Sequence, residues 1–179
     1  SRHDPALPLY TEQEARAVLA RFRSHDFGSS FEPVPGLHVH FHSAGHILGA
    51  ASIQAVSERG SVMFSGDLGR GDDLLMRPPV PPPDADVVVI ESTYGNRLHE
   101  RGDTLLALAE VVNRTLARGG HVVVPAFAVG RAQLLLHALR LLKDAHRIPD
   151  VPVFLDSPMA TDATALYQRH PELHRLDAN

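Results

Sequence analysis

An alternation of helical and strand-like segments runs through the second half of the chain, and it constrains the fold more than any other feature. The hydrophobic spacing predicts helices at about residues 103–118, 130–146 and 159–169, and buried strands at residues 122–125 and 151–155. Asp103 is suited to cap the first of these helices, and Gly119 to end it. Strands that alternate with helices form a parallel sheet that is covered on both faces. We therefore expect an α/β unit in this half.

The first half of the chain predicts shorter, hairpin-rich structure. Residues 37–42 alternate, with three histidines on one face of a strand and apolar side chains on the other. Residues 51–56 and 61–64 flank a glycine-containing turn and are typical of a hairpin. The apolar run within residues 86–91 is typical of a strand buried on both faces. A capping box predicts the start of an amphipathic helix over residues 11–23.

The composition is that of a globular protein. Of the 179 residues, 44% are hydrophobic and 21% are charged, and no apolar run approaches the roughly 18 residues that cross a bilayer. Cysteine is absent, which excludes disulfides and thiolate metal sites and is compatible with a cytoplasmic protein. The start carries no Met and no signal segment, so we expect an internal piece of a longer protein. A net charge of −4 argues against a generally basic surface, although a local basic groove can still meet nucleic acid.

The chain has twelve histidines, and without cysteine any metal would need His, Asp or Glu as ligands. His38, His40 and His42 share one strand face, which allows a metal site, but alternating histidines fit a solvated sheet face better. Six other histidines follow no ligand spacing, and we expect surface or packing roles for them: His99, His121, His137, His146, His170 and His174.

Polar clusters follow several of the predicted strands, which is where α/β folds place ligand sites. His46 lies between two glycines in residues 43–49, so its ring has the freedom to point inward, with a purely structural histidine as the alternative. Asp67 ends a strand in a glycine-bracketed turn and could form the turn or bind a metal. Glu91 follows four apolar residues and needs a partner or a cleft, because an unpaired carboxylate is costly to bury.

A fourth cluster passes from a predicted strand into a helix over residues 125–133. Free amides at the helix start, at Gly130, together with the Arg131 guanidinium could hold a phosphate. The alternative is a turn whose arginine pairs with a surface carboxylate. A weaker cluster occupies residues 156–160, and the proline-rich residues 77–83 fit a surface connector better than a ligand for proline-binding domains.

Taken in order, the clusters resemble the β-CASP branch of the metallo-β-lactamase superfamily. The resemblance covers nearly the whole chain and is strongest to RNA-processing nucleases similar to the endonuclease subunit of the cleavage and polyadenylation factor. It is carried by Ala-Gly-His-Ile-Leu-Gly at 44–49, Ser-Gly-Asp at 65–67, Glu-Ser-Thr-Tyr-Gly at 91–95 with Arg97 and His99, and Pro-Ala-Phe-Ala-Val-Gly-Arg-Ala-Gln at 125–133.

The resemblance implies an α/β fold in two parts. Residues 1–97 would be the later part of a metallo-β-lactamase αββα sandwich, and residues 98–179 the first part of a Rossmann-like β-CASP domain, with the active site between them. It further implies His46 as a zinc ligand, Asp67 as a carboxylate that bridges two zinc ions, and Glu91 as the acidic residue that orients a general-acid histidine.

Two zinc ions that share a carboxylate and a water would activate that water for attack on a phosphodiester. By the same resemblance, Gly130 and Arg131 would hold an RNA phosphate.

Two parts of the family pattern are missing from this chain. Neither the upstream His-x-His-x-Asp-His motif nor the later histidine motifs occur. With His46 and Asp67 as ligands, a two-zinc centre cannot close, because each zinc takes about four donors. We therefore expect a fragment that lacks full activity and part of its core, from an intact protein for which a homodimer is one possible state.

The preferred interpretation is a piece of a zinc-dependent ribonuclease. The alternatives are a non-catalytic β-CASP scaffold or RNA-binding subunit, and a hydrolase of the same fold that acts on DNA or a small ester or thioester. His46, Asp67 and Glu91 match the catalytic pattern, which favours an enzyme over a scaffold. The choice of RNA over DNA depends on the family resemblance.

Overall fold

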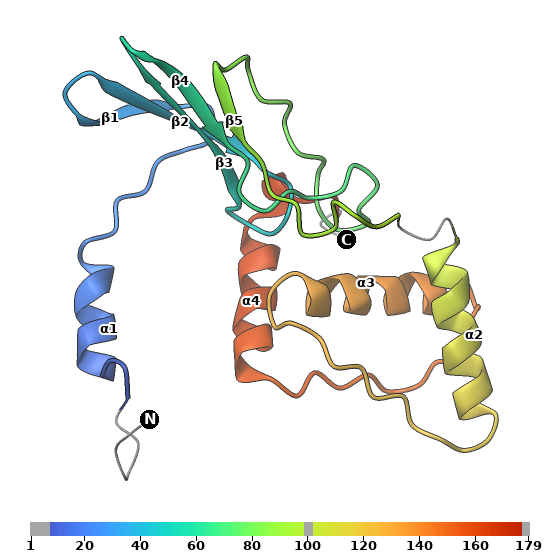
Figure 1. The fold of residues 1–179 in the computed structure, drawn as a ribbon. Coiled ribbons are helices and arrows are strands. Elements are labelled where there is room, and N and C mark those ends of the chain that lie inside the picture. The colour runs from blue at the N-terminus through green and yellow to red at the C-terminus, as the bar shows by residue number, and fades with distance from the viewer. Residues whose placement is uncertain (1–7, 99–101, 177–179) are drawn as a thin grey trace.

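The computed structural model describes residues 8–98 and 102–176, so His99 lies outside the described residues. These residues form the mixed α/β structure that the sequence predicts (Figure 1). In chain order, the elements are α1 (Glu12–Leu19), β1 (Ser30–Val34), β2 (Leu37–Ser43), β3 (Ala51–Ser57), β4 (Gly60–Phe64), β5 (Val87–Val89), α2 (Thr104–Leu116), α3 (Arg131–Asp144), α4 (Pro158–Arg169) and the 3₁₀ turn η1 (Pro171–Leu173).

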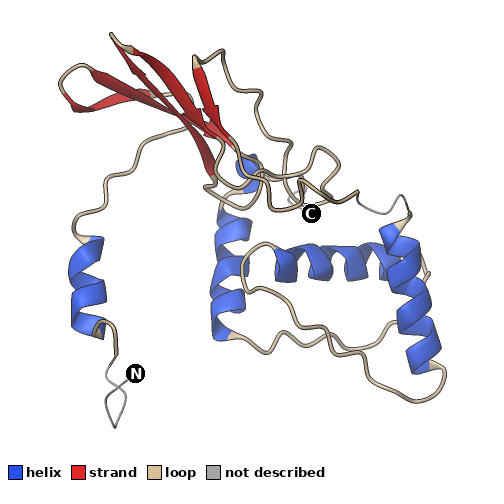
Figure 2. Ribbon diagram, viewed as in Figure 1, coloured by secondary structure: helices blue, strands red, loops and turns tan. Residues whose placement is uncertain are grey.

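The first half builds one five-stranded sheet in the order β1-β2-β3-β4-β5 (Figure 2). The first three pairings are antiparallel and β4–β5 is parallel. The strand at residues 37–42 and the following hairpin are therefore confirmed. The short strand β1 was not predicted, because Ser-Phe-Glu-Pro-Val shows no clear alternation and contains a proline. The β3–β4 hairpin lies between β2 and β5 in the sheet, and both of these strands lead into loops that carry candidate site residues.

The prediction that residues 86–91 form a fully buried strand is wrong. β5 is a three-residue edge strand paired with β4, and its valines are exposed, as is Ile90 at 65%. A continuous apolar run indicates that a strand needs cover on both faces, but it does not supply that cover. Within the described residues, neither face of β5 is covered.

The second half packs three helices in a row, with α3 contacting both α2 and α4 (Figure 1). Asp103 caps α2, since its Oδ1 accepts from the Leu106 amide at 3.0 Å, as predicted. The first of two small cores, between α2 and α3, consists of Ala109, Val112, Leu142 and Ile148.

The strands predicted at residues 122–125 and 151–155 are absent from the described structure. Both segments are irregular, and Val123 is 86% exposed. A strand exists only through hydrogen bonds to a neighbour, and neither segment has such a neighbour among the described residues. The parallel, covered sheet expected for this half is therefore not formed there.

Helix α1 begins at the predicted capping box but ends at Leu19 rather than at residue 23. The Thr11 amide donates to Glu14 Oε2 at 2.7 Å, and the Glu14 amide donates back to Thr11 Oγ1 at 3.3 Å. None of the helix residues is buried, and the helix lies apart from the sheet (Figure 1). No helix within the described residues has the length and apolarity to cross a membrane.

A second core joins the sheet half to the helical half. It comprises Leu75, Met76 and Tyr167, with Leu48, Leu134 and Leu176 packed against it. The proline-rich residues 77–83 run alongside without regular structure, and the Val80 amide donates to the Ser43 carbonyl at 2.9 Å, which fits the predicted connector. Through this core, Tyr167 of α4 packs against the loops that follow β2 and β4.

Candidate active site

Four loops carry the predicted site residues, and we name them by their central side chains. They are the His46 loop (residues 43–49) after β2, the Asp67 turn (residues 65–69) after β4, the Glu91 segment (residues 91–95) after β5, and the Arg131 turn (residues 125–133) before α3. The structure brings each of the four into contact with at least one of the others.

The Asp67 turn is pressed against the His46 loop at two glycines. The Gly69 amide donates to the Ala44 carbonyl at 2.8 Å. A Cβ placed on Gly69 would lie 1.8 Å from the Gly45 carbonyl oxygen, so no side chain fits there. This close approach fixes Asp67 and His46 on neighbouring stretches of backbone.

Glu91 joins the Asp67 turn through its carboxylate. Oε1 accepts from the Leu68 amide at 2.9 Å, and Oε2 accepts from the Thr93 amide at 3.3 Å. The hydrogen bond from the Leu68 amide is the main reason that the pKa of Glu91 lies below its ordinary value, and the electrostatic effect of His46 acts in the same direction. Glu91 is therefore an ionised carboxylate at neutral pH, and it finds the partner that its position after an apolar run requires.

Ser65 is a buried residue of this site that the sequence did not single out. Its Oγ accepts from the Glu91 amide at 2.9 Å, and its carbonyl accepts from Ser52 Oγ at 2.7 Å. The Ser65 amide also donates to the Val89 carbonyl, which extends the β4–β5 pairing into the site. The available signal was a pair of serines, Ser52 in the strand predicted at residues 51–56 and Ser65 directly after the strand predicted at residues 61–64.

The Arg131 turn contacts the His46 loop from the helical half. Gly130 has a φ of +81°, and a Cβ there would lie 2.8 Å from Cγ2 of Ile47, so glycine is required on both counts. The turn thereby brings the start of α3 to the residue that follows His46.

The amides at the start of α3 are not free to bind a phosphate, contrary to the prediction from the sequence. The amides of Gly130, Arg131 and Ala132 donate to Gln133 Oε1, the Val129 carbonyl and the Phe127 carbonyl, respectively. The Arg131 side chain is exposed, and we find no hydrogen bond or ion pair from it within the described residues. The guanidinium is thus the group left to meet a phosphate, and the alternative of a carboxylate partner is not seen in that part of the chain.

Tyr167 on α4 is a second residue that sequence reasoning missed. It is 3% exposed, and its hydroxyl has no well-formed hydrogen bond among the described residues. Burial raises the pKa of Tyr167, while the nearby Leu48 amide opposes that rise. The hydroxyl lies 3.8 Å from the point where a Gly130 Cβ would be, so α4 touches both the His46 loop and the Arg131 turn.

The metal donors present fit zinc in kind but not in number. His46 and Asp67 are exposed, and imidazole and carboxylate are both zinc ligands. Among the described residues, no group of three His, Asp or Glu side chains could hold a metal ion. Within the part of the chain that the structure describes, the two donors do not form a closed zinc site.

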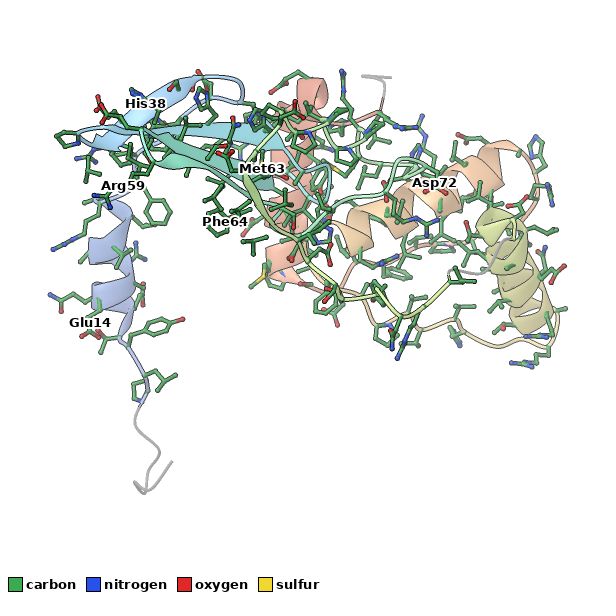
Figure 3. The ribbon with its side chains drawn as sticks, turned by 45° about the horizontal axis from the view of Figure 1, so that its top comes forward. Glu14, His38, Arg59, Met63, Phe64 and Asp72 are labelled. Atoms are coloured by element: carbon green, nitrogen blue, oxygen red, sulfur yellow. The ribbon has the colours of Figure 1, made fainter. Side chains whose placement is uncertain are left out.

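Of the three strand histidines, His38 lies away from this site, whereas His42 directly precedes the His46 loop. His38 pairs with Val56, five residues along β2 from Ser43, which corresponds to roughly 17 Å of strand. Figure 3 shows His38 at the opposite side of the view from Asp72, which follows the Asp67 turn. The rings of His40 and His42 are 6.4 Å apart and belong to no metal-binding group among the described side chains.

The cluster at residues 156–160 forms a helix start. Ser157 Oγ accepts from the Ala160 amide at 3.2 Å, and Pro158 occupies the first turn of α4. This arrangement accounts for the serine and the proline as capping residues.

Comparisons with known proteins agree with the resemblance to the β-CASP family. Residues 132–179 match the Beta-Casp domain. The chain is 36% identical over 163 residues to "Ribonuclease TTHA0252" of Thermus thermophilus, and the match covers 90% of this chain and 37% of that protein. It is 33% identical to "Cleavage and polyadenylation specificity factor 73" of Drosophila melanogaster, over 90% of this chain and 24% of that protein. It is also 35% identical to "Transcription termination factor FttA" of Pyrococcus abyssi, over 92% of this chain and 26% of that protein. The chain thus spans well under half the length of each of these relatives.

Proposed function

The chain belongs to the β-CASP branch of the metallo-β-lactamase superfamily, and from this premise we propose that it is part of a metal-dependent nuclease that hydrolyses RNA phosphodiester bonds. The observation that carries the proposal is that the loops of His46, Asp67 and Glu91 are joined by the Gly69–Gly45 contact and the Glu91–Leu68 hydrogen bond. Relatives named as a ribonuclease and as a cleavage factor support RNA as the substrate.

The proposal divides the chain near residue 97. Residues 1–97 would belong to the metallo-β-lactamase part and residues 98–179 to the β-CASP part. The five-stranded sheet lies wholly before residue 97, and the core between α2 and α3 lies wholly after it, which supports this division. Substrate would then bind between the parts, beside the His46 loop and the Arg131 turn.

We assign a role to each polar side chain at this junction. His46 and Asp67 would be two of the ligands of a zinc centre, with the remaining donors outside the described residues. Zinc bound there would supply an activated water and neutralise charge on the phosphoryl oxygens. Arg131 would bind a neighbouring RNA phosphate.

Glu91 is suited to orienting a partner rather than to giving up a proton itself. Its pKa is lowered, so it holds no proton to donate near neutrality. An ionised carboxylate instead fixes the tautomer of an adjacent imidazole and favours its charged form. This is the role that the family resemblance assigns to the acidic residue at this position.

The test uses the protein extended through its native flanking sequence. We would incubate it with 5′-labelled single-stranded RNA and with DNA of the same sequence, and follow both binding and cleavage. The proposal predicts that RNA is cleaved and DNA is not. Binding of RNA without cleavage would support the scaffold alternative, and preferred cleavage of DNA would support the DNA-directed one.

The cofactor is tested separately by counting bound zinc in the same preparation. The proposal predicts about two zinc ions per extended chain, and fewer in the 179-residue piece. A metal-free extended protein that still cleaves RNA would contradict the zinc assignment. A cytoplasmic location and a homodimeric intact protein are parts of the same proposal, and cell fractionation and light scattering test them.

A further inference from the structure

Gln133, two residues after Arg131, is 4% exposed on the first turn of α3 and is bonded through both ends of its amide. Oε1 accepts from the Gly130 amide at 2.7 Å. Nε2 donates to the Ala128 carbonyl at 3.0 Å, and it also lies 3.2 Å from the Ala160 carbonyl and 3.0 Å from Thr164 Oγ1. One side chain thus ties both ends of the 128–130 stretch to α4.

The position demands an amide. The Gly130 N–H needs an acceptor, whereas the Ala128 carbonyl needs a donor, and a glutamine side chain supplies both within one planar group. A glutamate would face the Ala128 and Ala160 carbonyls with acceptor oxygens, and a leucine would leave buried polar groups of the backbone unpaired. The network fixes the orientation of the Gln133 amide, because in the reversed orientation the Gln133 NH2 group would face the Gly130 N–H, and both are donors.

The bonded stretch is the one from which Arg131 projects. Gly130 is held in a left-handed conformation by this hydrogen bond and by the contact with Ile47, and Arg131 begins α3 directly after it. The guanidinium extends into solvent without a hydrogen bond or ion pair among the described residues. A flexible cation loses less entropy on binding when its backbone is already fixed.

We propose that Gln133 is a positioning residue that sets the Arg131 turn, so that the Arg131 guanidinium meets a phosphate of the RNA strand beside the His46 loop. This inference rests on the proposed RNA-binding role of Arg131. Gln133 itself is buried and does not touch the RNA; it acts through Arg131 and through the anchor on α4.

The experiment is a double-mutant cycle in the full-length protein. The variants are Arg131→Ala, Gln133→Leu and the two combined, with Gln168→Leu as the matched control on the exposed face of α4. We would measure the Kd for a labelled single-stranded RNA over a range of salt concentrations, KM and kcat for cleavage, and thermal unfolding.

Arg131→Ala should weaken RNA binding roughly tenfold and reduce the salt dependence by about one phosphate contact. Gln133→Leu should raise KM by about three- to tenfold with little change in kcat. In the Arg131→Ala background, Gln133→Leu should raise the Kd by less than about twofold, although it should lower the melting temperature as much as it does in the wild-type background. Gln168→Leu should change none of these.

An undiminished effect of Gln133→Leu on RNA binding in the Arg131→Ala background would overturn the inference, because Gln133 would then act independently of Arg131. If Gln133→Leu does not fold, Thr164→Val removes one partner of the same amide and should show the same coupling at smaller size. A wild-type Kd in Arg131→Ala would overturn the inference while RNA cleavage by that variant would leave the proposed nuclease function standing.

Discussion

Gly69 leaves no room for a side chain against the Gly45 carbonyl, so its substitution tests how firmly the Asp67 turn is held. Gly69→Ala should lower the free energy of unfolding of the full-length protein by about 2–3 kcal/mol, because backbone rather than a flexible side chain must move. Gly71→Ala is the matched control, since nothing lies within 4 Å of a Cβ there. Equal unfolding curves for the two variants in urea would contradict the close contact.

Glu91 gives a pH-dependent prediction. Its pKa is lowered in the folded state, chiefly by the Leu68 amide, so its contribution to stability is present above the ordinary carboxyl value and is lost as the pH falls through the folded value. Glu91→Gln should therefore be less stable than the wild-type protein at pH 7 and approach it below about pH 4.

Urea denaturation across this pH range measures the effect. Glu91→Gln should also lose RNA cleavage by roughly a hundredfold, because a neutral amide no longer favours a charged imidazole. A stability difference that grows toward acid pH would show that Glu91 is not an ionised acceptor in the fold.

The residue scale also shows what the sequence could and could not predict at the site. His46, Asp67 and Glu91 were predicted from their places after strands and from the order of their motifs; the structure brings their loops together, and their roles stay predictions. The hydrogen-bond partner of Glu91 was not predicted. The Leu68 amide follows β4 whereas Glu91 follows β5, and the two come together only through the pairing of these strands. Gln133 and Tyr167 were not predicted either, since their roles arise from tertiary contacts with α4 and the His46 loop.

At the scale of elements, α4 is joined to the His46 loop through a tyrosine whose hydroxyl is buried without a well-formed partner. Removing such a hydroxyl removes its desolvation cost, so Tyr167→Phe should match the wild-type stability within about 1 kcal/mol or exceed it. Tyr167→Ala should cost about 3–5 kcal/mol, because it empties the small core that joins the two halves.

Thermal and urea unfolding of the two variants measure this difference, with Tyr10→Phe as the exposed control. A large loss of stability in Tyr167→Phe would mean that the hydroxyl has a strong partner in the folded protein.

Elements that depend on local chemistry were predicted well. The caps at Thr11 and Asp103 and the β3–β4 hairpin follow from neighbouring residues and appear as expected. The strands predicted at residues 122–125 and 151–155 failed, because pairing depends on a distant neighbour that hydrophobic spacing does not identify. The same limit explains why β5 is an exposed edge rather than a buried strand.

At the scale of the whole molecule, one sheet face carries an apolar row that crosses four strands. Phe41, Ile53, Phe64 and Val89 are aligned by the strand registers, and the last three are exposed. Figure 3 shows Phe64 among the side chains of this sheet. An uncovered apolar surface of this kind binds hydrophobic dyes.

The isolated 179-residue chain should therefore enhance the fluorescence of an anilinonaphthalene dye and unfold with low cooperativity. The protein extended through its flanking sequence should bind little dye and unfold in a sharper transition at higher temperature. Equal dye binding by the two proteins would mean that the apolar row is not covered by the flanking sequence.

The central claim is that the joined loops form the active site of an RNA nuclease, and the rate of RNA cleavage by Asp67→Ala in the full-length protein tests it most directly. Asp162→Ala, on an exposed position of α4, is the matched control. We predict that Asp67→Ala lowers the cleavage rate by roughly a thousandfold or more while Asp162→Ala cleaves at the wild-type rate. Cleavage by Asp67→Ala at the wild-type rate would contradict the account, because the reaction would then proceed without the residue at the centre of the proposed site.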